Sequence, residues 1–242
     1  MTQLEFVAEC KRLFELNQLP CTDEQAESLY ALTMRMLEVN QSMNLTAIKE
    51  EKAVILRHYV DSLMISDCIP LNSRVIDVGC GAGFPSLPLA IFRPDLSITS
   101  LDGTAKRIRY VEETAQMLGL SNVTTIAGRA EEYANQSRYR EKFDVATARA
   151  VAALPVLCEL CLPFVRVDGQ MIAMKSQQAR DEISLAKQGI SLCGGGEVSL
   201  RECDLRENND AAECRTLVLI KKVSPTPKNY PRHFSQISKK PL

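Results

Sequence analysis

The sequence predicts a doubly wound α/β fold with a seven-stranded, mostly parallel sheet. From Arg74 onward, short apolar runs alternate with amphipathic stretches, which is typical of repeated strand–helix units. A glycine-rich turn at residues 79–83 stands between one predicted strand and one predicted helix. Before residue 70 no strand-like pattern occurs. The chain therefore reads as a helical N-terminal region followed by a sheet domain.

Residues 1–70 form the predicted N-terminal helical subdomain. Thr22 followed by Gln25 makes a capping box, and apolar residues recur after it at helical spacing. The sheet domain is expected over residues 71–223. Its predicted strands are Arg74–Gly79, Ser97–Asp102, Val123–Ala127, Phe143–Arg149, Gly169–Lys175, Glu197–Cys203 and Cys214–Val223. Its predicted helices are Pro85–Phe92, Thr104–Leu118, Ala153–Pro163 and Ala179–Gly189, with a flexible link at Gly194–Gly196.

The last 19 residues, 224–242, form a tail that contains four prolines. Six of the 29 basic residues lie in Lys221–Leu242, which has no Asp or Glu. Proline and like charge predict an extended tail that is ordered only when something holds it. Because the rest of the chain is acidic, this asymmetry indicates an anionic partner for the tail. Deleting the tail is then expected to weaken RNA binding and to leave cofactor binding nearly intact.

Composition places the chain among ordinary globular proteins, with 45% hydrophobic and 24% charged residues. No run approaches the roughly 18 apolar residues of a membrane span, and the N-terminus is charged where a signal peptide is apolar, which predicts a cytoplasmic protein. The nine cysteines are scattered and odd in number, so reduced, mostly buried thiols are expected. The single CxxC, Cys158–Cys161, lacks a second ligand pair, and we predict no metal site.

The glycine-rich turn carries the chemistry. It reads Asp77-Val78-Gly79-Cys80-Gly81-Ala82-Gly83, and Phe84 stands where a dinucleotide-binding loop needs its third glycine. A nicotinamide or flavin cofactor is therefore disfavoured. The pattern resembles motif I of class I methyltransferases, in which the loop accommodates the methionine part of S-adenosylmethionine. The resemblance implies cofactor contacts at Gly79, Gly81 and Gly83.

The acidic residue that ends the second strand, Asp102, is expected by the same resemblance to accept the ribose hydroxyls. The alternative is that Asp102 only caps the helix that begins near Thr104. Asp77 likewise either serves the cofactor or only anchors the turn. The sequence leaves both alternatives open.

Further segments narrow the resemblance to the RsmG/GidB family, from about residue 20 to the C-terminus. They are Met43–Ile48, His58 with Asp61–Leu63, Gly79–Pro85 with Pro88–Ala90, Asp102 with Lys106–Arg107, Gly128–Glu132, Ala148–Ala150 and Met174–Lys175. The chain departs from the family pattern at three positions near the expected cofactor, which are Ser86, Gly103 and Ser176. None of these replaces a charged or glycine residue on which the cofactor prediction depends.

This resemblance implies a class I S-adenosylmethionine-dependent methyltransferase that modifies N7 of a guanine in small-subunit (16S) ribosomal RNA. Beyond the glycines and Asp102, it implies cofactor contacts at Phe84, Ala130, Glu131 and Arg149. For Arg149 the alternative is a simple ion pair at a strand end. The partner is expected to be the ribosomal RNA or the assembled small subunit, and the oligomeric state is not predicted.

Basic side chains are the predicted RNA contacts, with the alternative that those on a helix surface are merely solvated. They are Lys106, Arg107, Arg109, Arg129, Lys175, Lys228 and Arg232.

No catalytic acid or base is predicted, since N7 of guanine carries a free lone pair and loses no proton on methylation. The end of the fourth strand reads Thr147-Ala148-Arg149-Ala150, which is unlike the Asn/Asp-Pro-Pro-aromatic segment used for exocyclic amines. Arg149 is expected to help position the reactants. Two alternatives stay open: methylation of another RNA or of a small molecule, and a non-catalytic ribosome assembly factor.

Overall fold

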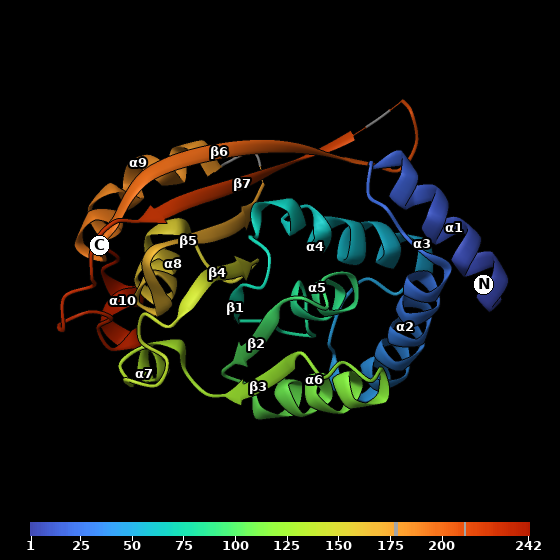
Figure 1. Cartoon of the computed structure of the whole chain (residues 1–242), viewed down its shortest axis with the longest axis horizontal. Coiled ribbons are helices and arrows are strands. Elements are labelled where there is room, and N and C mark those ends of the chain that lie inside the picture. The colour runs from blue at the N-terminus through green and yellow to red at the C-terminus, as the bar shows by residue number, and fades with distance from the viewer. Residues whose placement is uncertain (177–178, 211) are drawn as a thin grey trace.

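A computed structural model describes residues 1–176, 179–210 and 212–242. Its strands form one seven-stranded sheet in the order β3-β2-β1-β4-β5-β7-β6 (Figure 1). The strands are β1 (Arg74–Val78), β2 (Ser97–Asp102), β3 (Val123–Ala127), β4 (Phe143–Arg149), β5 (Val165–Lys175), β6 (Gly195–Arg206) and β7 (Ala212–Lys222). Strands β1 to β5 are parallel, whereas β7 pairs antiparallel with both β5 and β6. The predicted doubly wound sheet with a terminal antiparallel hairpin is confirmed.

Helices cover both sides of the sheet. The N-terminal region provides α1 (Gln3–Leu16), α2 (Asp23–Met43), α3 (Glu51–Val54), a π-helix η1 (Ile55–Val60), α4 (Asp61–Leu63) and the 3-10 turn η2 (Ser66–Cys68). The sheet domain adds α5 (Ser86–Phe92), α6 (Ala105–Met117), α7 (Ala130–Tyr133), α8 (Leu154–Cys161), the 3-10 turn η3 (Leu162–Phe164), α9 (Ala179–Leu192) and α10 (Phe234–Lys239). In Figure 1 the N-terminal helices gather with α5 and α6, and α7 to α10 gather at the other side. None of the helices in the described ranges is long and apolar enough to cross a membrane.

Two hydrophobic clusters separate along the same division. One joins α1 and α2 to α5, α6 and one face of the sheet, and the other joins α7 to α10 to the opposite face. The central strand β1 supplies Val75 to the first cluster and Ile76 to the second, and both side chains are fully buried. A strand buried on both faces is typical of parallel sheets. The N-terminal helices thus share a core with the sheet domain.

The capping predicted for residues 1–70 is present. Thr22 and Gln25 form the expected capping box on α2, and Thr2 with Glu5 forms another on α1. The two helices bury Phe6, Phe14 and other apolar side chains in the hydrophobic cluster that they share with the sheet domain. Local sequence therefore sets where these helices begin, and tertiary packing holds them.

The expected flexible link at Gly194–Gly196 is wrong, because β6 already begins at Gly195. Gly195 pairs with Lys222 of β7. A β-carbon on Gly195 would lie 2.8 Å from the Ile190 side chain and 3.0 Å from that of Ile220. Glycine is therefore required here by close packing, which a glycine run alone does not reveal.

The rest of the chain holds the tail, and the tail is not extended throughout, because α10 spans Phe234–Lys239. Arg232 forms an ion pair with Glu159 of α8 at 2.6 Å, and the Glu159 side chain is fully buried. Arg140 donates hydrogen bonds to the carbonyl oxygens of Thr226 and Tyr230, and Ile237 in α10 is completely buried. The partners of the tail lie about 70 to 100 residues away, so the tail composition alone could not show them.

We predict that deleting residues 224–242 lowers the melting temperature by roughly 10 °C. The deletion leaves the Glu159 carboxylate buried without its partner, which costs about 3–5 kcal/mol, and each kcal/mol shifts the melting temperature by about 2–4 °C in a domain of this size. Thermal unfolding followed by circular dichroism measures the effect. Lys228→Ala serves as the control because this lysine is exposed. A truncated protein that melts with the wild type would show that the tail packing contributes little.

Candidate active site

The glycine-rich loop leaves β1 with a backbone that only glycine adopts easily. Gly79, Gly81 and Gly83 have φ angles of +77°, +57° and +86°. A β-carbon on Gly81 would meet nothing within 4 Å, so the backbone of this residue faces open space. A β-carbon on Gly83 would lie 2.5 Å from Leu87. The loop thus packs closely at one glycine and presents bare backbone at another.

Asp102 ties this loop to the end of β2. One carboxylate oxygen accepts the Gly81 N–H at 3.0 Å, and the other accepts the Thr104 N–H at 2.8 Å. The N–H groups of Gly79 and Cys80 both donate to the carbonyl oxygen of Leu101. Asp102 therefore does hold the turn before α6, as the structural alternative required, and it also borders the open space beside Gly81.

Asp77 is a fully buried carboxyl beneath the loop. Its Oδ2 accepts the Ser86 N–H at 3.2 Å, whereas Oδ1 has no hydrogen-bond partner within the described part of the chain. Burial raises the pKa of Asp77 to about 7, and hydrogen bonding from Ser86 opposes that shift. Asp77 anchors the turn, and it keeps one oxygen without a donor.

A cavity of about 300 Å³ lies beside the loop, at the carboxyl ends of β1 and β2. Four residues predicted from the sequence, Gly79, Asp102, Ala130 and Glu131, line it together. In an open parallel sheet ligands bind at this edge, where the strand order reverses between β1 and β4. Carboxylates and exposed backbone at the rim suit a small molecule that carries hydroxyl or amino groups.

Three apolar residues that the sequence analysis missed also line this cavity. They are Val151 and Leu160, which follow β4, and Phe234 of α10. The Arg129 guanidinium lies 4.3 Å from the centre of the Phe234 ring. No local signal marks Phe234, since it belongs to a tail that was expected to be extended.

Phe84 and Arg149 lie outside this lining, in a neighbouring cluster. The Phe84 ring stacks on His58 with centroids 4.5 Å apart, and the Arg149 guanidinium is 5.3 Å from the Phe84 centroid. Arg149 also forms an ion pair with Asp61 at 3.0 Å and donates to the carbonyl oxygen of Arg57. The ion-pair alternative for Arg149 is thus present in the structure.

His58 reaches this cluster from the π-helix η1, which the sequence analysis did not predict. Its Nε2 lies 2.9 Å from the Thr46 hydroxyl, and its Nδ1 lies 3.4 Å from Arg149 Nη2. Burial and the charge of Arg149 lower the pKa of His58 to about 3. His58 is therefore a neutral side chain near pH 7.

The predicted RNA-contacting residues either border the cavity, are exposed, or form ion pairs with a carboxylate. Arg107 and Arg129 border the cofactor-type cavity, and Lys106 and Arg109 are exposed on α6. Lys175 ends β5 and pairs with Glu182, and Lys228 is exposed in the tail. Arg232 is held by Glu159.

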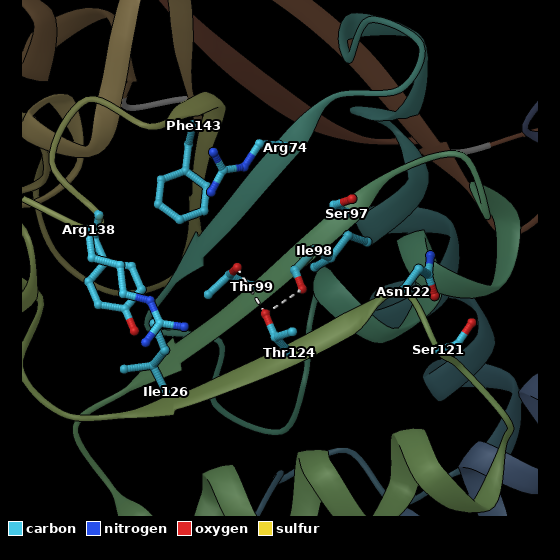
Figure 2. Close-up of a pocket in the computed structure, with 11 residues that line it drawn as sticks. Arg74, Ser97, Ile98, Thr99, Ser121, Asn122, Thr124, Ile126, Arg138 and Phe143 are labelled. Carbon is cyan, nitrogen blue, oxygen red and sulfur yellow. Dashed lines mark hydrogen bonds between the residues drawn. The ribbon is translucent and has the colours of Figure 1, made fainter.

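A larger cavity of about 360 Å³ lies elsewhere, over β1, β2 and β3. Figure 2 shows Arg74 beside Phe143 at one wall, and the hydrogen-bonded side chains of Thr99 and Thr124 on the sheet below. It contains none of the predicted cofactor residues. Size alone therefore does not identify the functional site.

The fold and the glycine loop define a class I S-adenosylmethionine-dependent methyltransferase. Among solved structures the chain is similar to precorrin-6y C5,15-methyltransferase of Geobacter metallireducens, with a TM-score of 0.51 and 13% identity, over 75% of this chain and 91% of that one. It is also similar to M. jannaschii TYW2 in complex with AdoMet, with a TM-score of 0.52 and 12% identity, over 67% and 77% of the two chains. At these identities the likeness shows the fold.

The family follows from sequence. The family model GidB, rRNA small subunit methyltransferase G, matches residues 25–210. A protein of Lactobacillus helveticus named Ribosomal RNA small subunit methyltransferase G is 42% identical over 91% of this chain and 92% of its own. One of Clostridium novyi with the same name is 43% identical over 84% and 83%. The chain belongs to the rRNA small subunit methyltransferase G family, which confirms the resemblance found in the sequence.

We predict that Asp77→Asn flattens the pH dependence of stability between pH 5 and 8. The pKa of Asp77 is about 7 in the folded state and near 4 when unfolded, so the folded state binds an extra proton in this window and wild-type stability falls as pH rises. Urea unfolding at pH 5 and pH 8 measures the difference. Asp95→Asn is the control, because the pKa of Asp95 is about 2 and lies outside the window. Equal slopes for wild type and Asp77→Asn would contradict the prediction.

Proposed function

We propose that this protein transfers a methyl group from S-adenosylmethionine to N7 of a guanine in small-subunit ribosomal RNA. The observation that carries the proposal is the cavity that joins the glycine loop to Asp102 and to Ala130–Glu131. Relatives named for small-subunit ribosomal RNA methylation at about 40% identity support the substrate. A ribosomal RNA substrate implies that the protein works in the cytoplasm.

The residues of the cavity fit the cofactor. Gly81 presents backbone to open space, and Asp102 and Glu131, which line the cavity, supply carboxylates for hydroxyl groups. Apolar walls from Val151, Leu160 and Phe234 suit an adenine ring. The proposed cofactor-binding set is Gly79, Gly81, Gly83, Phe84, Asp102, Ala130, Glu131 and Arg149.

When bound, S-adenosylmethionine supplies a methyl group carried by a sulfonium sulfur. The N7 lone pair forms the new bond to the methyl carbon, the electron pair of the broken C–S bond stays on sulfur, and the positive charge passes to the purine. The protein has no proton to remove in this transfer. This agrees with a neutral His58 whose two ring nitrogens are both in contact with neighbours. The side chains around Arg149 are proposed to align the base and exclude water.

The proposed RNA contacts are the basic side chains near the cavity mouth and on exposed surfaces. Arg107 and Arg129 border the cavity, and Lys106, Arg109 and Lys228 are exposed. Lysine and arginine in such positions neutralise phosphates, and RNA affinity then falls as salt rises. Arg232 is left out of this set because its guanidinium is engaged by Glu159.

We predict that Asp102→Ala weakens S-adenosylmethionine binding by about 1–3 kcal/mol, or ten- to a hundredfold, because the ribose hydroxyls lose their acceptor. The Gly81 N–H loses its partner as well, which loosens the loop. Isothermal titration calorimetry measures the affinity, and Asp181→Ala on α9 controls for the removal of a carboxylate outside the cavity lining. Wild-type affinity in a folded Asp102→Ala protein would refute the role of Asp102.

We predict that the product is N7-methylguanine. Small subunits from cells that lack the protein are incubated with the purified enzyme and labelled S-adenosylmethionine, and borohydride reduction followed by aniline then cleaves RNA at the charged N7-methylguanine. Labelled RNA is expected to be cut at the labelled guanine. Labelled RNA that resists cleavage, or label on an exocyclic amine or a ribose, would overturn the N7 assignment.

A further inference from the structure

A second cavity, of about 290 Å³, opens at the carboxyl ends of β4 and β5. Ala150 lines this cavity, and the next residue, Val151, lines the cofactor-type cavity. The segment that follows β4 therefore stands between the two spaces. A group held in the second cavity lies beside the first, separated by one turn of chain.

The Lys175–Glu182 pair in this cavity has one donor and one acceptor left over. The Lys175 ammonium donates to the Ala152 carbonyl oxygen at 2.9 Å and to Glu182 Oε2 at 2.8 Å, which leaves one of its three N–H groups. Glu182 Oε2 also accepts the Leu154 N–H, whereas Oε1 accepts no hydrogen bond in the described ranges. The two side chains are only 12% and 24% exposed, so their orientation is restricted.

The other carboxylate in the cavity is fully engaged. Asp61 accepts from Arg149 through Oδ2 at 3.0 Å and from Arg215 through Oδ1 at 2.9 Å. Both arginines line the cavity, and Asp61 holds them side by side. Among the acidic residues that line this cavity, Glu182 is therefore the one with an oxygen available to a ligand.

A donor next to an acceptor is the complement of one edge of guanine. Guanine presents its O6 acceptor beside its N1–H donor, whereas adenine presents a donor amine beside an acceptor nitrogen. We propose that this cavity receives the target guanine, with Lys175 donating to O6 and Glu182 Oε1 accepting N1–H. The proposal rests on the proposed function and makes Glu182 the residue that selects the base.

The position of Lys175 also orients the base. Its ammonium is tethered to the Ala152 carbonyl, in the same segment as the Val151 side chain that covers Gly79. N7 is the ring nitrogen on the same side of guanine as O6. Holding O6 at Lys175 therefore turns N7 toward the dividing segment and the cofactor cavity, and the N1 side toward α9.

Glu182→Gln tests the proposal with small change in shape. The amide still offers one oxygen, but it cannot accept from Leu154 N–H, from Lys175 and from guanine N1–H at the same time. Glu202→Gln is the matched control. Glu202 lies on β6 and forms an exposed ion pair, at 2.9 Å, with Arg180 of α9, the helix that carries Glu182. Methyl transfer to unmethylated small subunits and to their free RNA is measured at saturating S-adenosylmethionine.

Glu182→Gln is expected to lower kcat/KM for the RNA by about ten- to a hundredfold while cofactor affinity stays within about twofold of wild type. Glu202→Gln is expected to behave as wild type. Wild-type kcat/KM in Glu182→Gln would overturn the proposal. An equal loss of cofactor affinity would also overturn it, because Glu182 would then act through the fold or the cofactor site.

Base selection is read separately, by the binding of nucleoside monophosphates to protein loaded with S-adenosylhomocysteine. Guanosine and inosine monophosphates share O6 and N1–H, so they are expected to bind alike and about tenfold more tightly than adenosine monophosphate. Glu182→Gln should abolish this preference and Glu202→Gln should keep it. No preference in the wild type would overturn the guanine pocket. If instead the wild type methylates no small-subunit RNA, the proposed function fails, whatever the nucleotides show.

Discussion

The hydrogen bond from Gly81 to Asp102 is the interaction on which the site depends. It fastens the loop after β1 to the end of β2, beside the two N–H groups that donate to Leu101. Positive φ angles at the three glycines let the chain turn sharply there without a side chain over the open backbone. The loop is therefore held in shape before any ligand arrives, and a preorganised site loses less entropy on binding.

The segment after β4 lies between the two cavities. Ala150 has a φ of +56°, a backbone conformation that residues other than glycine rarely adopt. It lies between Arg149, which points to the Asp61 cluster, and Val151, which covers Gly79. Strained backbone of this kind persists where the surroundings determine it, and it often marks functional sites. Here it places two consecutive residues, Ala150 and Val151, in the linings of two adjacent cavities.

Much of the fold was predictable because its signals are local. Strands β2, β3 and β4 begin and end at the predicted residues, since apolar runs and the turns between them set their limits. The Gly79–Gly83 loop and Asp102 were predictable because a glycine-rich turn and an acidic strand end carry chemical meaning on their own. Their meeting with Ala130–Glu131 follows from parallel strands whose carboxyl ends share one edge.

The rest depended on side-chain contacts that no sequence pattern marks. Glu182 appears in the sequence as an ordinary helix carboxylate, and only its contacts with Lys175 and Leu154 distinguish it. Phe234 and Arg232 belong to a tail whose prolines and positive charges predict exposure. Their partners, Arg129 and Glu159, lie more than 70 residues earlier in the chain. Side-chain pairing at such separations has no periodicity, so a single sequence contains no pattern that reveals it.

The tail links the stability of the fold to the proposed cofactor site. Phe234 of α10 lines the proposed cofactor cavity, and α10 is held in place by the buried Ile237 and by the Arg232–Glu159 pair. A ligand that contacts Phe234 binds more tightly to molecules whose tail is docked, so its binding stabilises the docked tail. The reverse holds by linkage, because any change that releases the tail lowers affinity for that ligand by the same factor. A segment whose composition indicates a flexible RNA-binding arm thus forms part of the wall of the proposed cofactor cavity.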